Sequence, residues 1–391
     1  MIVGVPKESF PGEKRVALIP ANAGQLAKLG VDVLVETGAG LAAGFTDAQY
    51  KEKGASIAEN RGAVIEKSTI VLQVRALGAN PDHADGELSA MRPGQILVGS
   101  LGPNAREQWG KKLAEQKVLA FAMEQMPRIT RAQDMDILSS MATVAGYKAV
   151  LLAAAALPKM FPMLMTAAGT VSPARVFIVG AGVAGLQAIA TAKRLGAVVH
   201  SYDIRPAVKE QVESLGAKFV DLGLDTGTAE DKGGYAKQMG EEFYRKQREV
   251  MTKVVAESDV VITTAAVPGK KAPILVTQDM VMAMKPGSVI VDLAAESGGN
   301  CELTEMNETV HKHGVQIIGP VNLATQVPFH ASQMFSKNLF NFLRLIIKNG
   351  KPELDLDDEC VADTLVAGAD DPFVKASGHL KQQEDKTETT E

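Results

Sequence analysis

Short apolar runs alternate with helix-length amphipathic segments through the first 125 residues of the chain. The segments between the runs end at Gly or Pro, as helices that connect strands commonly do. This alternation is typical of parallel strands joined by helices and predicts an α/β domain. The predicted strands lie at residues 1–5, 31–36, 69–74, 95–100 and 118–123.

A second series of the same kind begins at residue 174. Its regular spacing of apolar runs and helix-length segments predicts a second doubly wound sheet. The predicted strands lie at residues 175–179, 198–203, 218–221, 259–265, 288–293 and 315–319.

Three further segments complete the expected organisation. A helical pattern over 130–157 becomes almost wholly apolar from residue 149, which predicts a buried helix that connects two domains. Residues 222–235 are rich in Gly, Asp and Thr and predict a mobile loop, followed by a helix over 236–257. An amphipathic helix over 331–348 is expected to return to the first domain.

These elements predict the fold class, an α/β protein of two Rossmann-like doubly wound domains with a nucleotide-binding cleft between them. The first domain is expected to be discontinuous, formed by 1–136 and 320–378, and the second to span 137–319. Residues 379–391 contain no large apolar side chain and are expected to form a flexible polar tail.

Composition narrows the classes of function. The 391 residues are 46% hydrophobic and 22% charged, as in an ordinary globular protein. Lys and Arg number 41 against 46 Asp and Glu, and no dense basic cluster occurs, which argues against a nucleic-acid partner. Cys301 and Cys360 are the only cysteines, too few for a disulfide framework or a four-cysteine zinc site, and no metal is expected.

A G-x-G-x-x-G motif is the strongest chemical signal. Gly180, Gly182 and Gly185 follow a predicted strand and open a predicted helix, and Asp203 ends the next strand. This is the dinucleotide fingerprint, in which the helix N-terminus receives the pyrophosphate and the acidic residue accepts ribose hydroxyls. A carboxylate at that position repels a 2′-phosphate, so NAD(H) is favoured over NADP(H). Arg205 is expected to contact the edge of the adenosine or the surface.

A polar segment precedes the apolar connector. Gln133, Asp136 and Ser139 recur at three-to-four spacing, as on one face of a helix, with Arg128 and Arg131 just before them. The spacing alone fits a solvated helix face as well as a site over the nicotinamide end of a cofactor. A polar loop at 263–273 follows a strand's carboxyl end, where ligands of open α/β sheets bind.

With these residues in view, the chain resembles the NAD(H)-binding first domain of proton-translocating nicotinamide nucleotide transhydrogenases, the alpha subunit in its short bacterial form. The resemblance runs from Met1 to about Asn349. It rests on the opening VPKE, MPRITRAQDMDILSS, VSPARVFIVGAGVAGLQAIATAKRLGA, GGYAKQMGEEF, ITTAAVPGKKAP and MKPGSVIVDLA. The family is built like alanine dehydrogenase.

The resemblance implies the site residues. Those around the reacting nicotinamide, and so catalytic, are Arg128, Gln133, Asp136 and Ser139. The further residues that it implies for cofactor binding are Ile129, Thr130, Asp134, Met135, Val183, Ile204, Arg205, Gly234, Tyr235, Gln247 and Ala266, together with Gly180, Gly182, Gly185 and Asp203. Two positions depart from the usual family pattern, Lys271 in place of a proline and Thr130 in place of a serine.

The resemblance also implies partners. It predicts a homodimer that docks on the cytoplasmic face of the inner or plasma membrane, beside a membrane-spanning subunit and an NADP(H)-binding subunit. Hydride transfer between NAD(H) on this chain and NADP(H) on the partner would be coupled to proton translocation.

Two alternatives stay open on the sequence. One is a soluble enzyme like alanine dehydrogenase, with Arg15 and Arg75 binding a substrate carboxylate. Such an enzyme is expected to carry a catalytic histidine after the strand at 96–102 and an aspartate before Gly-Gly, where this chain has no histidine and has Glu296. The other is an NAD-binding sensor of redox state.

Overall fold

The computed structural model describes residues 1–221, 241–266 and 269–367. Internal contacts divide the chain into two compact units. Unit 1 comprises Met1–Met141 and the described part of Thr325–Glu391, and unit 2 comprises Ala142–Ala324. Unit 1 is therefore built from two stretches of sequence that flank unit 2 along the chain.

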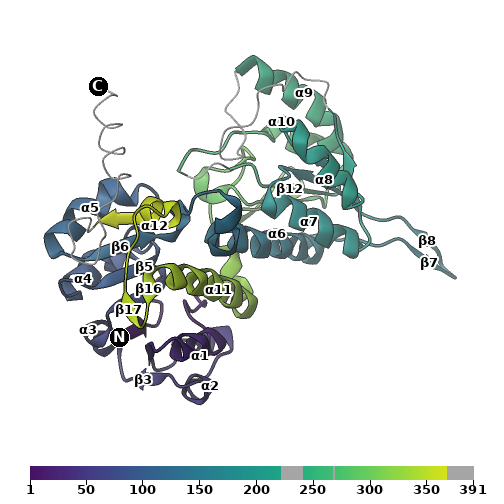
Figure 1. Cartoon of the computed structure of the whole chain (residues 1–391). Coiled ribbons are helices and arrows are strands. Elements are labelled where there is room, and N and C mark those ends of the chain that lie inside the picture. Colours follow the sequence, from purple (N-terminus) through teal and green to yellow (C-terminus); the bar gives the residue numbers. More distant parts are fainter. Residues whose placement is uncertain (222–240, 267–268, 368–391) are drawn as a thin grey trace. The chain divides into compact units, whose positions relative to one another are not determined.

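The sheet of unit 1 has the order β18-β6-β5-β4-β1-β2-β3 (Figure 1). All neighbouring strands are parallel except β18, which runs antiparallel to β6. The order reverses between β4 and β1, which makes the sheet doubly wound. Its strands are β1 Ile2–Val5, β2 Asp32–Glu36, β3 Ser56–Ala58, β4 Ile70–Arg75, β5 Ile96–Ser100, β6 Leu119–Ala122 and β18 Leu365–Ala367.

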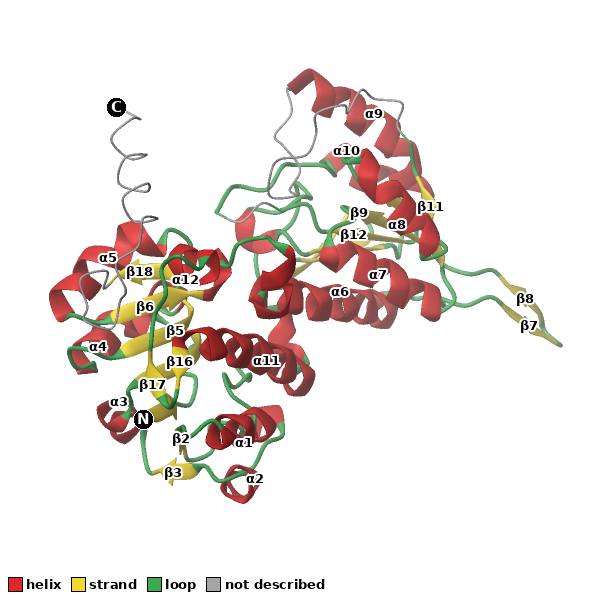
Figure 2. Cartoon of the chain, viewed as in Figure 1, coloured by secondary structure: helices red, strands yellow, loops and turns green. Residues whose placement is uncertain are grey.

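Helices cover both faces of this sheet (Figure 2). Alternate strand residues point to opposite sides, so Leu72 packs with one set of helices and Val71 with the other. The first set is α1 Pro20–Lys28, α2 Asp47–Glu52, α11 Pro328–Ile346 and α12 Glu359–Thr364. The second is α3 Arg61–Lys67, α4 Pro81–Ala90 and α5 Ala105–Gln116. A short pair, β16 Ile347–Lys348 and β17 Lys351–Pro352, follows α11.

The sheet of unit 2 has the order β11-β10-β9-β12-β13-β15-β14, with only β14 antiparallel to its neighbour. The predicted strands of both series form, and most are apolar runs that a doubly covered sheet buries on both faces. The strand predicted at 218–221 forms only over Lys218–Phe219, of which Lys218 is exposed and Phe219 half-buried. The strands are β9 Arg175–Val179, β10 Val198–Tyr202, β11 Lys218–Phe219, β12 Val260–Thr263, β13 Val289–Asp292, β14 Thr309–Lys312 and β15 Val315–Ile318.

Two helical layers enclose this second sheet. One layer contains α6 Ile137–Ala156, α7 Val183–Arg194 and α8 Lys209–Ser214, and the other contains α9 Glu241–Glu257 and α10 Gln278–Ala283. A hairpin of β7 Leu164–Thr166 and β8 Gly169–Val171 projects from this unit (Figure 1). The side chain of Met165 on the hairpin is 80% exposed.

The expected helix over 130–157 is wrong at its start. Residues Thr130–Met135 form a 3-10 turn, η4, and Asp136 is extended, so α6 begins only at Ile137. The expected burial on every side of this helix is also wrong. Within the apolar stretch, Ala149, Val150 and Ala153 are buried, whereas Leu151 is half-buried and Ala155 is exposed.

Helix α6 is long and apolar enough to span a membrane by length and composition, and 33% of its most apolar window is buried. A single helix of this kind is weak support for a span, because core helices satisfy the same criterion. The loop expected at 222–235, the first residues of the helix expected from 236, and the tail at 379–391 lie outside the described residues.

Candidate functional site

The Gly-rich turn lies between β9 and α7 at the point where the strand order of unit 2 reverses. Gly180 has φ +98°, a conformation that favours glycine. A Cβ on Gly185 would lie 1.8 Å from the carbonyl oxygen of Gly180, so only glycine lets the first turn of α7 pack on the strand. These two glycines are explained by the turn itself.

The presence of glycine at position 182 has a different explanation. A Cβ there would meet nothing closer than Nη2 of Arg205, at 4.0 Å, so the packing of the chain does not require glycine. Gly182 is the N-cap of α7 and brings no side chain to the first N–H groups of the helix. Val183, the next residue, is 40% exposed. The turn therefore presents backbone N–H groups to open space, which suits close approach of a phosphate.

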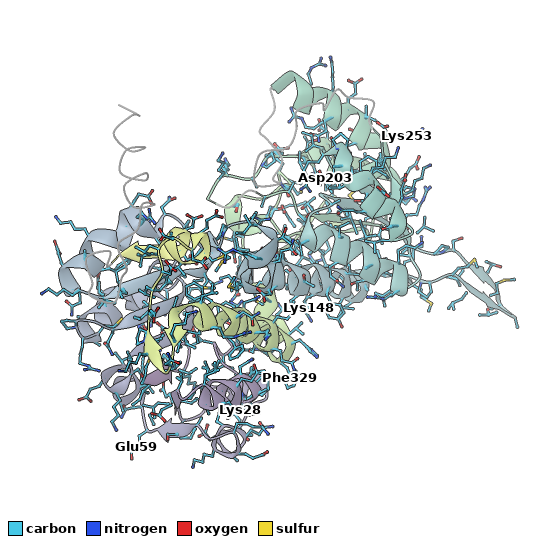
Figure 3. The ribbon with its side chains drawn as sticks, in the orientation of Figure 1. Lys28, Glu59, Lys148, Asp203, Lys253 and Phe329 are labelled. Atoms are coloured by element: carbon cyan, nitrogen blue, oxygen red, sulfur yellow. The ribbon has the colours of Figure 1, made fainter. Side chains whose placement is uncertain are left out.

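Asp203 follows β10 and is 8% exposed (labelled in Figure 3). Its Oδ2 accepts a hydrogen bond from the backbone N–H of Ala181 at 2.7 Å, which ties the carboxylate to the Gly-rich turn. The Arg205 side chain binds both carboxylate oxygens, with Nε on Oδ1 and Nη2 on Oδ2, each at 2.9 Å. Arg205 therefore pairs with Asp203 and is not the surface contact that one interpretation of the sequence expected.

Gln247 of α9 lies beside the same strand end. It is 2% exposed, and its Nε2 donates to the hydroxyl of Tyr202 at 2.9 Å. Its Oε1 is buried and accepts no hydrogen bond from the residues that the structure describes. Gln247 is thus bonded to Tyr202, the last residue of β10, and Asp203, half-buried Ile204 and Arg205 follow Tyr202 in the chain.

The loop after β12 is held by a residue that sequence reasoning missed. Asn300 is fully buried and binds Ala265 twice, accepting from its N–H at 3.0 Å and donating to its carbonyl at 2.8 Å. It also donates to the carbonyl of Pro273 at 2.9 Å. Buried Asp292 accepts in turn from the backbone of Asn300 at 2.8 Å. This network fixes the backbone beside Ala266, which is exposed.

The residues expected around the nicotinamide lie in and after η4. Asp136 accepts from the N–H and hydroxyl of Ser139, at 2.9 and 2.5 Å, and so caps the start of α6. Arg128, Thr130 and Gln133 are exposed. Ile129 and Met135, by contrast, pack with the core of unit 1, so their side chains have a structural role.

Helices distant in sequence hold this segment in place. Asn338 and Asn341 of α11 both donate to the carbonyl of Asp134, at 2.8 and 3.0 Å, and Asn341 also donates to its carboxylate at 2.9 Å. Arg131 forms a bidentate ion pair with Asp358, which precedes α12, at 2.9 and 2.6 Å. The side chain of Asp134 is therefore engaged as an anchor. No local pattern in the sequence indicates these bonds.

Charged side chains also collect where β1 and β4 of unit 1 end. Glu13 binds Arg15, with 2.6 Å between Oε2 and Nη2, and lies 3.5 Å from Nε of Arg75. Glu8 accepts from the backbone N–H groups of Val74 and Arg75 at 2.7 and 3.1 Å. Burial raises the pKa of Glu8 to about 8. The two arginines that the alanine dehydrogenase alternative assigns to a substrate thus share an internal carboxylate.

The structure brings together one group of predicted residues in each unit. In unit 2 the group comprises Gly180, Gly182, Val183, Gly185, Asp203, Ile204, Arg205, Gln247 and Ala266, at or beside the carboxyl ends of β9, β10 and β12. In unit 1 it comprises residues 128–139. Gly234 and Tyr235 lie outside the described residues.

The fold and this site define a dinucleotide-binding protein of the open α/β class. Two family models match the chain, the alanine dehydrogenase/PNT N-terminal domain over residues 4–145 and the C-terminal domain over residues 149–371. The chain therefore belongs to the alanine dehydrogenase/PNT family.

Within that family, transhydrogenase subunits resemble the chain more than alanine dehydrogenases do. It is 48% identical to the first part of NAD(P) transhydrogenase subunit alpha of Rhodospirillum rubrum, over 94% of this chain and 96% of that protein. It matches the crystal structure of transhydrogenase from Sinorhizobium meliloti with a TM-score of 0.82 and 43% identity, over 93% of this chain and 98% of that one. Alanine dehydrogenase of Bacillus subtilis is 33% identical, over 84% of this chain and 81% of that enzyme.

Proposed function

We propose that the chain is the NAD(H)-binding component of a proton-translocating transhydrogenase and exchanges a hydride with NADP(H) on a separate subunit. The observation that carries the proposal is Gly182, an N-cap glycine that the packing does not require, tied through Ala181 to the carboxylate of Asp203. A turn that admits a pyrophosphate beside an acceptor for ribose hydroxyls matches the two ends of an adenosine diphosphate group.

The choice of NAD(H) over NADP(H) rests on charge. Asp203 lies where the adenosine ribose is expected, and a carboxylate there binds hydroxyls but repels a 2′-phosphate.

The nicotinamide end is assigned to Arg128, Gln133, Asp136 and Ser139. Bound NAD(H) supplies the hydride chemistry, and hydride transfer between two nicotinamides needs no acid or base from the protein. The role of these residues is then to orient the ring and ribose. The bond from Ser139 to Asp136 and the anchoring of Asp134 by Asn341 give the segment the fixed geometry that such orientation requires.

The alanine dehydrogenase alternative has less support. Its candidate substrate arginines, Arg15 and Arg75, lie beside the internal carboxylate of Glu13, whose side chain has no exposed surface. No histidine occurs at residues 96–102, where an acid-base catalyst is expected. Close relatives by identity are transhydrogenase subunits.

The partners proposed are a second copy of this chain, a membrane-spanning subunit and an NADP(H)-binding subunit, with the chain held on the cytoplasmic face of the membrane. The Rhodospirillum rubrum relative is named as the first part of a subunit alpha, which implies other subunits. Apolar surface on unit 2 supports the second copy. Met165 on the hairpin is 80% exposed, Met163 just before the hairpin is 58% exposed, and Tyr147 of α6 is 40% exposed.

The test is a reconstitution of the full chain with the remaining transhydrogenase subunits in detergent. Oxidation of NADH coupled to reduction of an NADP⁺ analogue is expected only when all subunits are present. The isolated chain is expected to bind NADH and to leave alanine with NAD⁺ unchanged. Turnover of alanine by the isolated chain, or failure of the complete mixture to transfer hydride, would overturn the proposal.

A further inference from the structure

The Asp203 carboxylate accepts four hydrogen bonds from donors of the protein itself. A carboxylate offers about four lone-pair sites. Oδ1 accepts from the backbone N–H and from Nε of Arg205, at 2.8 and 2.9 Å. Oδ2 accepts from the N–H of Ala181 and from Nη2 of Arg205, at 2.7 and 2.9 Å. Most of these donors belong to one residue, Arg205.

The two kinds of donor differ in mobility. The backbone N–H groups of Ala181 and Arg205 are fixed by the turns in which they lie, whereas the guanidinium is carried on a flexible side chain. A ribose hydroxyl can reach Asp203 only if it replaces Nε or Nη2. The guanidinium is the group that must leave.

A second contact places the same side chain over the Gly-rich turn. The atom nearest to the position of a Cβ on Gly182 is Nη2 of Arg205, at 4.0 Å. The guanidinium therefore lies beside the open space that we assign to the pyrophosphate as well as on the acceptor assigned to the ribose.

From these contacts we infer that Arg205 is a displaceable plug that occupies the adenosine subsite of unit 2 and sets the affinity for NAD(H). The inference rests on the proposed function of this site. The ion pair is largely withdrawn from water, with side chains 14% and 6% exposed, so opening it opposes nucleotide binding. Apparent affinity falls in proportion to the fraction of molecules in which the site is open.

Substitution of Arg205 should therefore change the affinity for NAD(H) in the direction opposite to that expected for a residue that contacts the nucleotide. Removing a residue that contacts a ligand weakens binding, whereas removing a competitor strengthens it. The substitution Arg205→Gln should lower the dissociation constant for NADH about three- to tenfold, the range expected for loss of a modest ion pair. Arg205→Lys keeps the charge but loses the bidentate geometry, and should give a smaller change in the same direction.

The experiment is a fluorescence titration of NADH into the full-length chain and its variants. Arg175→Gln is the matched control, since Arg175 also pairs with an acid, Glu257, but at the amino end of β9, and its variant should bind as the wild type does. Reduced nicotinamide mononucleotide lacks the adenosine, and its affinity should be the same for Arg205→Gln and the wild type.

Each contrary outcome has a distinct meaning. Weaker or unchanged NADH binding by Arg205→Gln would overturn the plug, as would an equal gain in affinity for the mononucleotide. Failure of the wild-type chain to bind NADH would instead overturn the proposed function.

Discussion

Asn341 donates hydrogen bonds from one side-chain amide to both the carbonyl and the carboxylate of Asp134, at 3.0 and 2.9 Å. The two residues are 207 positions apart in sequence, within the discontinuous unit 1. This contact links the segment assigned to the nicotinamide to α11, whose neighbouring residues Phe342 and Leu343 are fully buried. A rigid helix thus fixes a short turn.

Replacing Asn341 should therefore disturb hydride transfer more than nucleotide binding. For Asn341→Leu we expect hydride transfer in the reconstituted complex to fall about tenfold and the folded chain to lose about 1–2 kcal/mol of stability, because both hydrogen bonds from Asn341 to Asp134 are lost. NADH affinity, set in unit 2, should change little. Stopped-flow transfer rates and NADH titration measure the two effects separately.

Asn338→Leu is the matched comparison for that variant. Asn338 makes a single bond to Asp134, and its Oδ1 is buried without a partner among the described residues, so the effect should be smaller. Equal losses of transfer rate in the two variants would argue against the positioning role of Asn341.

The close packing of Gly185 predicts a severe effect for Gly185→Ala. The added Cβ would lie 1.8 Å from backbone oxygen, which must move. We expect a loss of stability of about 1–3 kcal/mol and loss of detectable NADH binding. Gly86→Ala on α4 is the control, since a Cβ there meets no atom within 4 Å, and it should be neutral or slightly stabilising. Retained NADH affinity in Gly185→Ala would contradict the assignment of the turn.

Asp203→Ala should weaken NADH binding at least tenfold, because hydrogen bonds to a charged acceptor contribute about 1.5–3 kcal/mol each. The freed Arg205 should at the same time reduce discrimination against NADPH. Parallel titrations with both nucleotides measure the ratio, with Asp279→Ala, at the exposed start of α10, as the control. If the ratio of NADH affinity to NADPH affinity equals that of the wild type, Asp203 does not distinguish the ribose of NADH from the 2′-phosphorylated ribose of NADPH.

Glu124 predicts a pH dependence of stability. Its Oε1 accepts from the N–H groups of Leu101 and Gly102, while Oε2 is buried without a partner among the described residues. Burial raises the pKa of Glu124 from 4.5 to about 7. Between these values the folded chain holds a proton that the unfolded chain has released, so stability falls as pH rises through this window, by up to about 1.4 kcal/mol per pH unit.

Glu124→Gln should remove this contribution, because the amide keeps an oxygen for the two N–H groups and never ionises. Urea unfolding at several pH values from about 5 to about 7 measures the slope across the window between the two pKa values. Glu115→Gln, on the exposed surface of α5, should retain the wild-type slope. An unchanged slope in Glu124→Gln would assign the pH dependence to other groups, of which Glu8 is the first candidate.

The exposed hairpin predicts an effect on self-association. Met165→Asp places a charge in an apolar surface that we assign to a second copy, and should raise the dimer dissociation constant at least tenfold. Met282 of α10 is also exposed, at 54%, and Met282→Asp should leave self-association unchanged. Sedimentation velocity distinguishes the two, and a wild-type dimer content in Met165→Asp would exclude the hairpin from the interface.

Much of the fold follows from local pattern. Strands such as Val260–Thr263 are short, largely apolar and fully buried, so their sequence specifies a buried strand without further information. The Gly-rich turn is equally local, because steric demands at Gly180 and Gly185 arise within a few residues. Short edge strands such as β3 and β18 carry a weaker signal and were not predicted.

The side-chain network of the site could not be predicted in the same way. Asn300 binds Ala265, 35 residues away, and Asn341 binds Asp134 although the whole of unit 2 separates them in sequence. Such bonds depend on the finished fold and leave no periodicity in the sequence. The mistaken helix at 130–135 has a related cause, since its polar spacing fits a helix while Asp136, in extended conformation, caps the next one instead.

The discontinuity of unit 1 has a consequence for synthesis of the chain. Strand β6 ends at Ala122, but its outer neighbour β18 begins only at Leu365, roughly 240 residues later. At ribosomal rates of about 5–20 residues per second, the interval is about ten to fifty seconds. During that time the nascent chain exposes the edge of β6 and the apolar face that α11 later covers. Unit 2 can complete its own sheet first, which makes unit 1, although it begins the chain, the last part to mature on the ribosome.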